Sequence, residues 1–197
     1  MRVHLVYAHP SPTSFAAAIR DRVVAALEAG GHEVDVFDLY AASFNPVLSP
    51  SEWAANGDPA KNQAGVEAEV ARLRAAEALV LCFPTWWYGM PAILKGWFDR
   101  VWVPGVAFHL PPGGGQIRPG LTNIRQLWVV TTHGAPGWFI AWLGNPGRTV
   151  LLRGLARVIA PGAGKRFLTL YRMDGASRPR LERFLRRLDR TFQSFGR

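Results

Sequence analysis

The alternation of strand-like and helix-like segments constrains the fold of this chain more than any other feature of its sequence. Residues 78–83 form an unbroken apolar run, and residues 126–132 repeat that character, which is typical of central parallel strands buried on both faces. Residues 2–8, 33–39 and 166–171 are further strand candidates. Because strands that alternate with helices are joined by right-handed crossovers, the sequence predicts a doubly wound α/β sheet of five parallel strands with helices on both faces.

Helix-like segments separate these strands. Apolar residues recur at helical spacing within residues 14–29, and Gly30 follows, as glycines commonly do after a helix. Residues 40–62 and 108–122 are rich in turn residues, so we interpret them as long connections. A length of 197 residues predicts a single domain, residues 1–197. Further helices are expected at 65–76, 91–101 and 148–159, and in an arginine-rich C-terminal segment.

Doubly wound sheets bind ligands outside the carboxyl ends of their strands, where the strand order reverses. This rule directs attention to three loops, one after each of the first, third and fourth predicted strands. The first loop, residues 9–15, opens a helix with hydroxyl groups at Thr13 and Ser14. A helix N-terminus with free N–H groups suits a phosphate, and helix capping by Thr13 or Ser14 is an equally good interpretation.

The second loop places three consecutive aromatic residues directly after a central strand: Trp86, Trp87 and Tyr88. Such a row is typical of a wall against a flat apolar ring, with backbone amides bonding the polar edge of the ring. Packing between two copies of the chain is the alternative. The third loop combines glycine with hydroxyl residues, which allows close backbone approach to a ligand. Its His133 is a candidate proton donor or charge stabiliser, or else simply polar surface.

Three sequence motifs lie in these loops. The first is Tyr7-Ala8-His9-Pro10 followed by Thr13-Ser14-Phe15. The second runs from Phe83-Pro84 through Trp87-Tyr88-Gly89-Met90-Pro91 to Asp99-Arg100-Val101, and the third is Thr131-Thr132 with Gly134. In this order, within residues 2–137, they resemble the NAD(P)H:quinone oxidoreductase family, which has a flavodoxin-like fold. The second motif is the most specific of the three. The third is similar to the Thr-Thr-Gly-Gly element of the family, with His133 in place of the first glycine.

The resemblance implies site residues at the matched positions. Those that would lie along the phosphate and ribose of a flavin are His9, Thr13, Ser14, Phe15 and Ala16. Those that would contact the isoalloxazine ring are Pro84, Thr85, Trp86, Trp87 and Tyr88, with Thr131, Thr132, His133 and Gly134 on its pyrimidine side. His133 and Tyr88 are the candidate catalytic side chains.

The resemblance also implies the cofactor, the reaction and the assembly. The expected cofactor is FAD, with FMN as the alternative because the chain is shorter than the long FAD-dependent members. The expected reaction is a ping-pong, two-electron (hydride) reduction of a quinone or related electrophile by NADPH or NADH. We expect a homodimer with the acceptor pocket at the subunit interface. The tyrosine and histidine that follow the Thr-Thr-Gly-Gly element in well-known quinone reductases, and form their charge relay, have no clear match in residues 138–148.

The remaining features of the sequence limit where the protein can be located and what it can bind. The single cysteine, Cys82, excludes an internal disulfide and predicts a reducing, cytoplasmic compartment. The longest apolar stretch, residues 78–94, is interrupted by prolines and a glycine, so we expect no membrane span. The histidines show no metal-ligand spacing, so no metal site is expected. The net charge is +9, and the basic face of the C-terminal segment carries Arg178, Arg180, Arg183, Arg186, Arg187, Arg190 and Arg197.

That basic face has two interpretations, a solvated surface or a surface for anionic partners. Nucleic acid is not an expected partner, because the sequence contains no recognition motif for it. The leading hypothesis is therefore a quinone-reducing flavoenzyme. The alternative is a flavin-binding regulatory subunit of a membrane transporter, or an electron-carrier flavoprotein. The basic helix and the aromatic stretch at residues 138–143 keep this alternative open.

Overall fold

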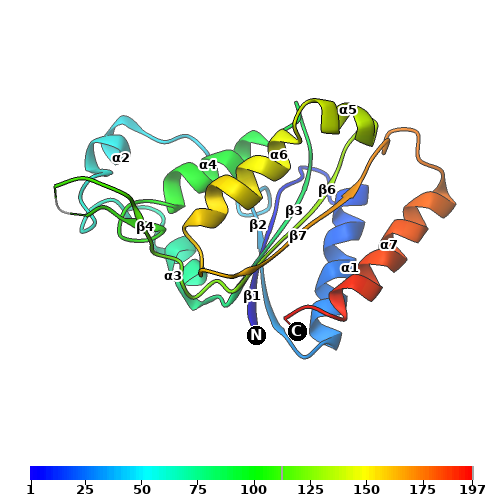
Figure 1. Cartoon of the computed structure of the whole chain (residues 1–197), viewed down its shortest axis with the longest axis horizontal. Coiled ribbons are helices and arrows are strands. Elements are labelled where there is room, and N and C mark those ends of the chain that lie inside the picture. The colour runs from blue at the N-terminus through cyan, green and yellow to red at the C-terminus, as the bar shows by residue number, and fades with distance from the viewer. Residues whose placement is uncertain (112, 197) are drawn as a thin grey trace.

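The structure is a computed structural model that describes residues 1–111 and 113–196, and it contains a five-stranded sheet in the order β2-β1-β3-β6-β7 (Figure 1). All four neighbouring pairs are parallel, which confirms the doubly wound sheet. Pro112 and Arg197, assigned from the sequence to a turn and to the basic segment, lie outside the described residues. The strands are β1 (Arg2–Tyr7), β2 (Glu33–Asp38), β3 (Ala78–Pro84), β6 (Gln126–Thr132) and β7 (Gly164–Leu170).

Helices cover both faces of this sheet. Figure 1 shows two helices side by side on one face, α1 (Phe15–Ala29) and α7 (Arg178–Phe192). The other face is covered by α3 (Glu67–Ala75), α4 (Ala92–Val101) and α6 (Pro146–Thr149). The helices expected at residues 14–29, 65–76 and 91–101 are confirmed to within two residues at each end.

Strand β3 supplies both hydrophobic cores, because successive side chains of a strand point to opposite faces. Leu79, Leu81 and Phe83 pack into the core beneath α3 and α4. Ala78, Val80 and Cys82 pack into the core beneath α1 and α7. Burial of Cys82 raises the pKa of its thiol to about 12, as befits a core residue. The second loop therefore begins at the end of β3, a strand that is packed against helices on both faces.

One predicted helix is wrong. Residues 148–159 do not form a single α-helix, because α6 is followed by a π-helical turn, η1 (Val150–Gly154), and a 3₁₀ turn, η2 (Leu155–Arg157). Gly154 weakens a helix interior. Beyond it, the Leu121 N–H donates to the carbonyl of Val158 (2.9 Å), and the Ala160 N–H donates to that of Ile124 (3.2 Å). These tertiary bonds hold the chain in place where the segment ends.

The long connections contain short elements of their own. Residues 40–62 hold α2 (Pro50–Ala55), which begins with a capping box between Ser49 and Glu52. Glu52 also accepts from Nε of Arg100 on α4 (2.8 Å), so this connection packs on the α4 layer. Residues 108–122 contain a small antiparallel pair, β4 (Phe108–His109) with β5 (Arg118–Pro119). Helix α5 (Gly137–Trp142) follows β6.

Two searches of the described part of the chain gave no candidates. None of its helices has the length and apolar character needed to cross a membrane. Within the same residues, no three or more His, Cys, Asp or Glu side chains are grouped so as to hold a metal ion.

Candidate functional site

The three loops identified from the sequence meet at one edge of the sheet. They follow β1, β3 and β6, which are neighbours in the strand order, and they enclose a cavity of about 570 Å³. The position matches the expected binding crevice of a doubly wound sheet. The cavity is lined by His9, Pro84, Thr85, Trp86, Trp87, Thr132, Gly134, Met173 and Asp174.

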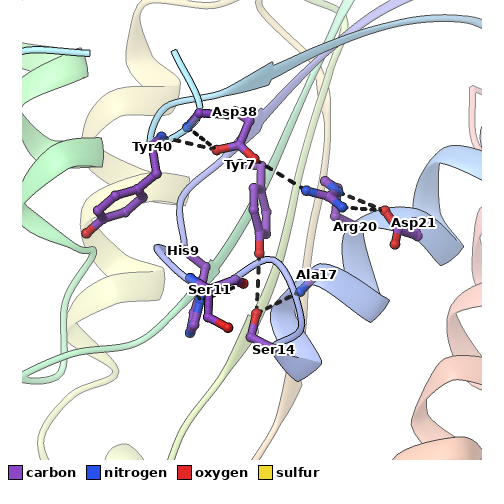
Figure 2. Close-up of polar contacts among 10 residues, drawn as sticks. Tyr7, His9, Ser11, Ser14, Ala17, Arg20, Asp21, Asp38 and Tyr40 are labelled. Carbon is purple, nitrogen blue, oxygen red and sulfur yellow. Dashed lines mark hydrogen bonds and ion pairs between the residues drawn. The ribbon is translucent and has the colours of Figure 1, made fainter. Parts of the chain in front are cut away.

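The first loop is organised around His9 and the start of α1 (Figure 2). The backbone N–H of Ser11 donates to Nδ1 of His9 (2.9 Å). Because Nδ1 accepts this bond, the ring proton of a neutral His9 sits on Nε2. Ser14 is the N-cap of α1, and its Oγ accepts from the N–H of Ala17 (3.1 Å). The capping interpretation therefore holds for Ser14, whereas Thr13 is exposed and its hydroxyl lies 3.3 Å from the Ser11 hydroxyl.

Capping by Ser14 leaves other donors at this helix end. Within the described chain, the backbone N–H groups of Phe15 and Ala16 have no hydrogen-bond acceptor. They lie at the positive end of the α1 dipole, which favours an anion. Capping and phosphate binding are therefore compatible at this helix.

A polar network beneath the first loop joins it to the end of β2 (Figure 2). The Arg20 guanidinium lies 4.6 Å from the ring centroid of Tyr7 and contacts Asp38 at 3.4 Å. Asp38 in turn accepts from the backbone N–H of Tyr40 (3.1 Å). The Tyr7 hydroxyl lies 3.4 Å from Oγ of Ser14, and burial raises its pKa. This network holds the loop that carries His9.

The second loop makes a sharp reversal between Trp86 and Gly89. Two backbone hydrogen bonds join these residues (3.1 and 3.0 Å), while Trp87 and Tyr88 have φ values of +48° and +64°. Left-handed backbone is unfavourable for bulky residues. It turns Trp87 outward, where its side chain is 94% exposed. Tyr88 faces Phe139 of α5, with ring centroids 6.0 Å apart, and does not line the cavity.

These aromatics continue onto α5. Trp138 and Trp142 are 69% and 75% exposed, and each packs against Phe139 at 5.7 Å between ring centroids. We name Trp87, Tyr88, Trp138, Phe139 and Trp142 the aromatic rim. An exposed apolar group of this size marks an interaction surface.

The third loop lies partly behind the cavity wall. Thr131 and His133 are both buried and contact Thr85 instead of lining the cavity. Oγ1 of Thr85 is 2.9 Å from Oγ1 of Thr131 and 3.3 Å from Nε2 of His133, and the Thr85 N–H donates to the Thr132 carbonyl (2.9 Å). The His133 ring stacks on Tyr171 (5.3 Å). Burial lowers the pKa of His133, so its neutral form predominates near pH 7.

Two cavity residues were not predicted from the sequence. Met173 and Asp174 come from the loop after β7, because the carboxyl end of this strand reaches the same edge of the sheet. The strand-end rule would have found them had it been applied to all strands. A Cβ atom at Gly134 would overlap Oδ2 of Asp174. Gly134 is therefore what allows this carboxylate to stand so close to the third loop.

The fold and the site together define a doubly wound α/β protein with an aromatic-walled cavity at the strand ends. A family model described as a flavodoxin-like fold matches residues 1–190. The chain belongs to this flavodoxin-like family.

Comparison with individual proteins refines this placement. The chain is 38% identical over 150 residues to NAD(P)H dehydrogenase [quinone] 1 of Rattus norvegicus, a match that covers 68% of the chain and 54% of the rat protein. The chain thus spans about half the length of this relative. Among solved structures, Smu.1420 from Streptococcus mutans UA159 has a TM-score of 0.85 and 31% identity, covering 98% of this chain and 99% of that protein. NAD(P)H:quinone oxidoreductase from Methanothermobacter marburgensis has a TM-score of 0.84 and 26% identity, covering 98% of each. The resemblance to the NAD(P)H:quinone oxidoreductase family that the sequence motifs predicted is confirmed.

Proposed function

We propose that this chain is a flavin-dependent NAD(P)H oxidoreductase that reduces quinones or related electrophiles by two electrons. The observation that carries the proposal is the aromatic-walled cavity at the carboxyl ends of neighbouring strands. The first loop, which contributes His9 to this cavity, leads into the start of α1, where two N–H groups have no acceptor within the described chain. Relatives with quinone-reductase names support the same class of reaction.

The residues around the cavity fit a flavin. Its volume of about 570 Å³ lies in the usual range for cofactor pockets. The N–H groups of Phe15 and Ala16 and the Nε2–H of His9 are donors suited to a phosphate. Gly134 lines the cavity without a side chain of its own, and Trp86 supplies a flat apolar surface in the same cavity.

A bound flavin would supply a ring that accepts two electrons from a nicotinamide and passes them to the acceptor. The protein would bind this ring, orient it and shield it from water. Thr85 lines the cavity, and its hydroxyl contacts Nε2 of His133 behind the cavity wall at 3.3 Å. In this proposal His133 orients Thr85, which revises its predicted role as a direct participant. Trp86 would shield one side of the ring, whereas the exposed Trp87 and Tyr88 belong to the aromatic rim beside the cavity.

The aromatic rim is the proposed contact surface for the acceptor and for a second copy of the chain. A second, mainly apolar cavity of about 480 Å³ lies on the α4 side of the molecule, lined in part by Trp53, Phe98, Trp102 and Ile117. Exposed apolar surface of this kind supports a homodimer. The proposal treats residues 1–197 as one domain and keeps FAD as the cofactor, FMN as the alternative, and NADPH or NADH as the donor. The cytoplasmic location stays a prediction.

A visible absorbance scan tests this proposal. The purified protein with added flavin is recorded before and after anaerobic NADPH or NADH, and again after menadione. Bleaching of the flavin band followed by its recovery is the expected result. Failure to bind either FAD or FMN would refute the proposal, and a stable flavin complex that neither nucleotide bleaches would refute the enzymatic part.

One observation favours the regulatory or carrier function as a second candidate. The acids of α7 pair elsewhere, Glu182 with Arg178 and Asp189 with Arg22. No carboxylate of the described chain lies within 4 Å of Arg183, Arg187 or Arg190, which line one side of the helix. Such a basic surface fits an acidic partner. Unbleachable flavin together with binding of such a partner would select this candidate.

A further inference from the structure

Asp174 is the one carboxylate among the residues that line the candidate flavin cavity. The protein has a net charge of +9, yet no Lys, Arg or His nitrogen of the described chain lies within 4 Å of this carboxylate. The cavity lining also contains no Lys or Arg. A carboxylate without an ion-pair partner at the edge of a cavity acts electrostatically on whatever occupies that cavity.

The structure holds this carboxylate in place through its backbone. The Met173 N–H donates to the carbonyl of His133 (2.9 Å), and the Arg172 N–H donates to that of Ala135 (3.2 Å). These two bonds fix the loop after β7 on either side of Gly134. Arg180 of α7 reinforces it by donating to the carbonyl of Tyr171 (2.6 Å). Three segments of the chain therefore keep Asp174 close to Gly134: the loop after β7, the third loop and α7.

The cationic groups of the described chain that lie near Asp174 do not pair with it directly. Burial lowers the pKa of His133, the nearest titratable group of the third loop, so it carries little positive charge near pH 7. Arg180 is directed at the carbonyls of Tyr171 and Arg172. The negative charge of Asp174 is screened mainly by solvent, since the residue is exposed.

We propose that Asp174 biases a bound flavin toward its oxidised state. This inference rests on the proposed function. A reduced flavin carries a negative charge near neutral pH, whereas the oxidised ring is neutral, so a nearby carboxylate disfavours the reduced form alone. The consequence is a lower reduction potential, which strengthens the drive to pass electrons on to an acceptor.

The test is the variant Asp174→Asn, which removes the charge and nearly preserves the shape. FAD and FMN are titrated to obtain the Kd of the oxidised flavin, and the midpoint potential is measured by anaerobic equilibration with a reference dye. The expected result is that the ratio of oxidised to reduced Kd rises about tenfold, which for a two-electron couple raises the potential by about 30 mV. The shift should shrink at high salt.

Glu28→Gln is the matched control, because Glu28 is an exposed carboxylate at the far end of α1, remote from the three loops. It should leave the potential unchanged. If the wild-type chain binds flavin and Asp174→Asn has the same potential, the inference is overturned while the proposed function stands. If the wild-type chain binds no flavin, both are overturned. If Asp174→Asn and Asp174→Ser both lose flavin binding, Asp174 is a binding residue and the redox bias is overturned.

Discussion

Replacing Gly134 with alanine separates the requirements of the candidate site from those of the fold. Gly134 does not have a positive φ, so alanine can adopt its backbone conformation. The new methyl group would overlap Oδ2 of Asp174, but this side chain is exposed and can rotate away. The fold therefore has a simple way to accommodate alanine, whereas a flavin packed against this loop and against Asp174 does not.

The expected magnitudes follow from these contacts. Alanine at a compatible position gains about 0.4–1 kcal/mol by restricting the unfolded chain, which offsets the displacement of Asp174. We therefore expect the free energy of unfolding to change by less than about 1 kcal/mol, or about 2–4 °C in Tm. An extra methyl group in a packed contact costs about 1–3 kcal/mol, so the Kd for flavin should rise about 5- to 150-fold.

Flavin titration and thermal unfolding without flavin measure the two quantities separately. Gly175→Ala is the matched control, since a Cβ there meets no atom within 4 Å and the residue lies in the same loop as Asp174. It should change neither quantity. Unaltered flavin affinity in Gly134→Ala would show that the third loop does not approach the ring. A loss of more than about 2 kcal/mol of stability would show that the reasoning about Asp174 is wrong.

Three further outcomes are expected. The hydrogen bond from His4 lowers the pKa of Asp35, so this carboxylate stabilises the fold above its ordinary pKa near 3.9, and that stability is lost as the pH falls through its folded value. Asp35→Asn should therefore flatten the acid limb of urea-unfolding stability below about pH 4, and an unchanged limb would contradict this. Cys82, with a pKa raised to about 12, should resist a thiol reagent at pH 8 until urea unfolds the chain, and rapid labelling of the native protein would refute its burial. Trp138→Ala should raise the quinone KM more than it weakens flavin binding, and equal losses would count against a role for the aromatic rim in acceptor binding.

The arrangement of the strands could be predicted from the sequence because buried parallel strands have a simple signature. The apolar run at residues 78–83 needed no tertiary information, and β3 was found as Ala78–Pro84. The segment at residues 148–159 needed such information. Its apolar spacing is helical, but bonds from distant residues such as Leu121 and Ile124 hold the chain where the segment ends. Periodicity does not register contacts of this kind.

The candidate site was also predicted only in part from the sequence, and the rest depended on tertiary contacts. The motifs located the residues from β1, β3 and β6 that line the cavity, because each directly follows a strand. They did not distinguish Thr85, which lines it, from His133, which lies behind Thr85. Asp174 was missed because its position depends on the path of the loop after β7. Backbone hydrogen bonds to the carbonyls of His133 and Ala135 determine that path.

The reversal at Trp87 and Tyr88 bears on how this chain has evolved. A two-residue turn with both φ values positive is ordinarily built from asparagine and glycine, which adopt it at little cost. Two large aromatic residues there cost about 1 kcal/mol or more each, so selection for stability alone would replace them. Their presence therefore points to selection acting on the side chains and not on the turn. A library of second-loop variants sorted for stability alone should lose these two aromatics first.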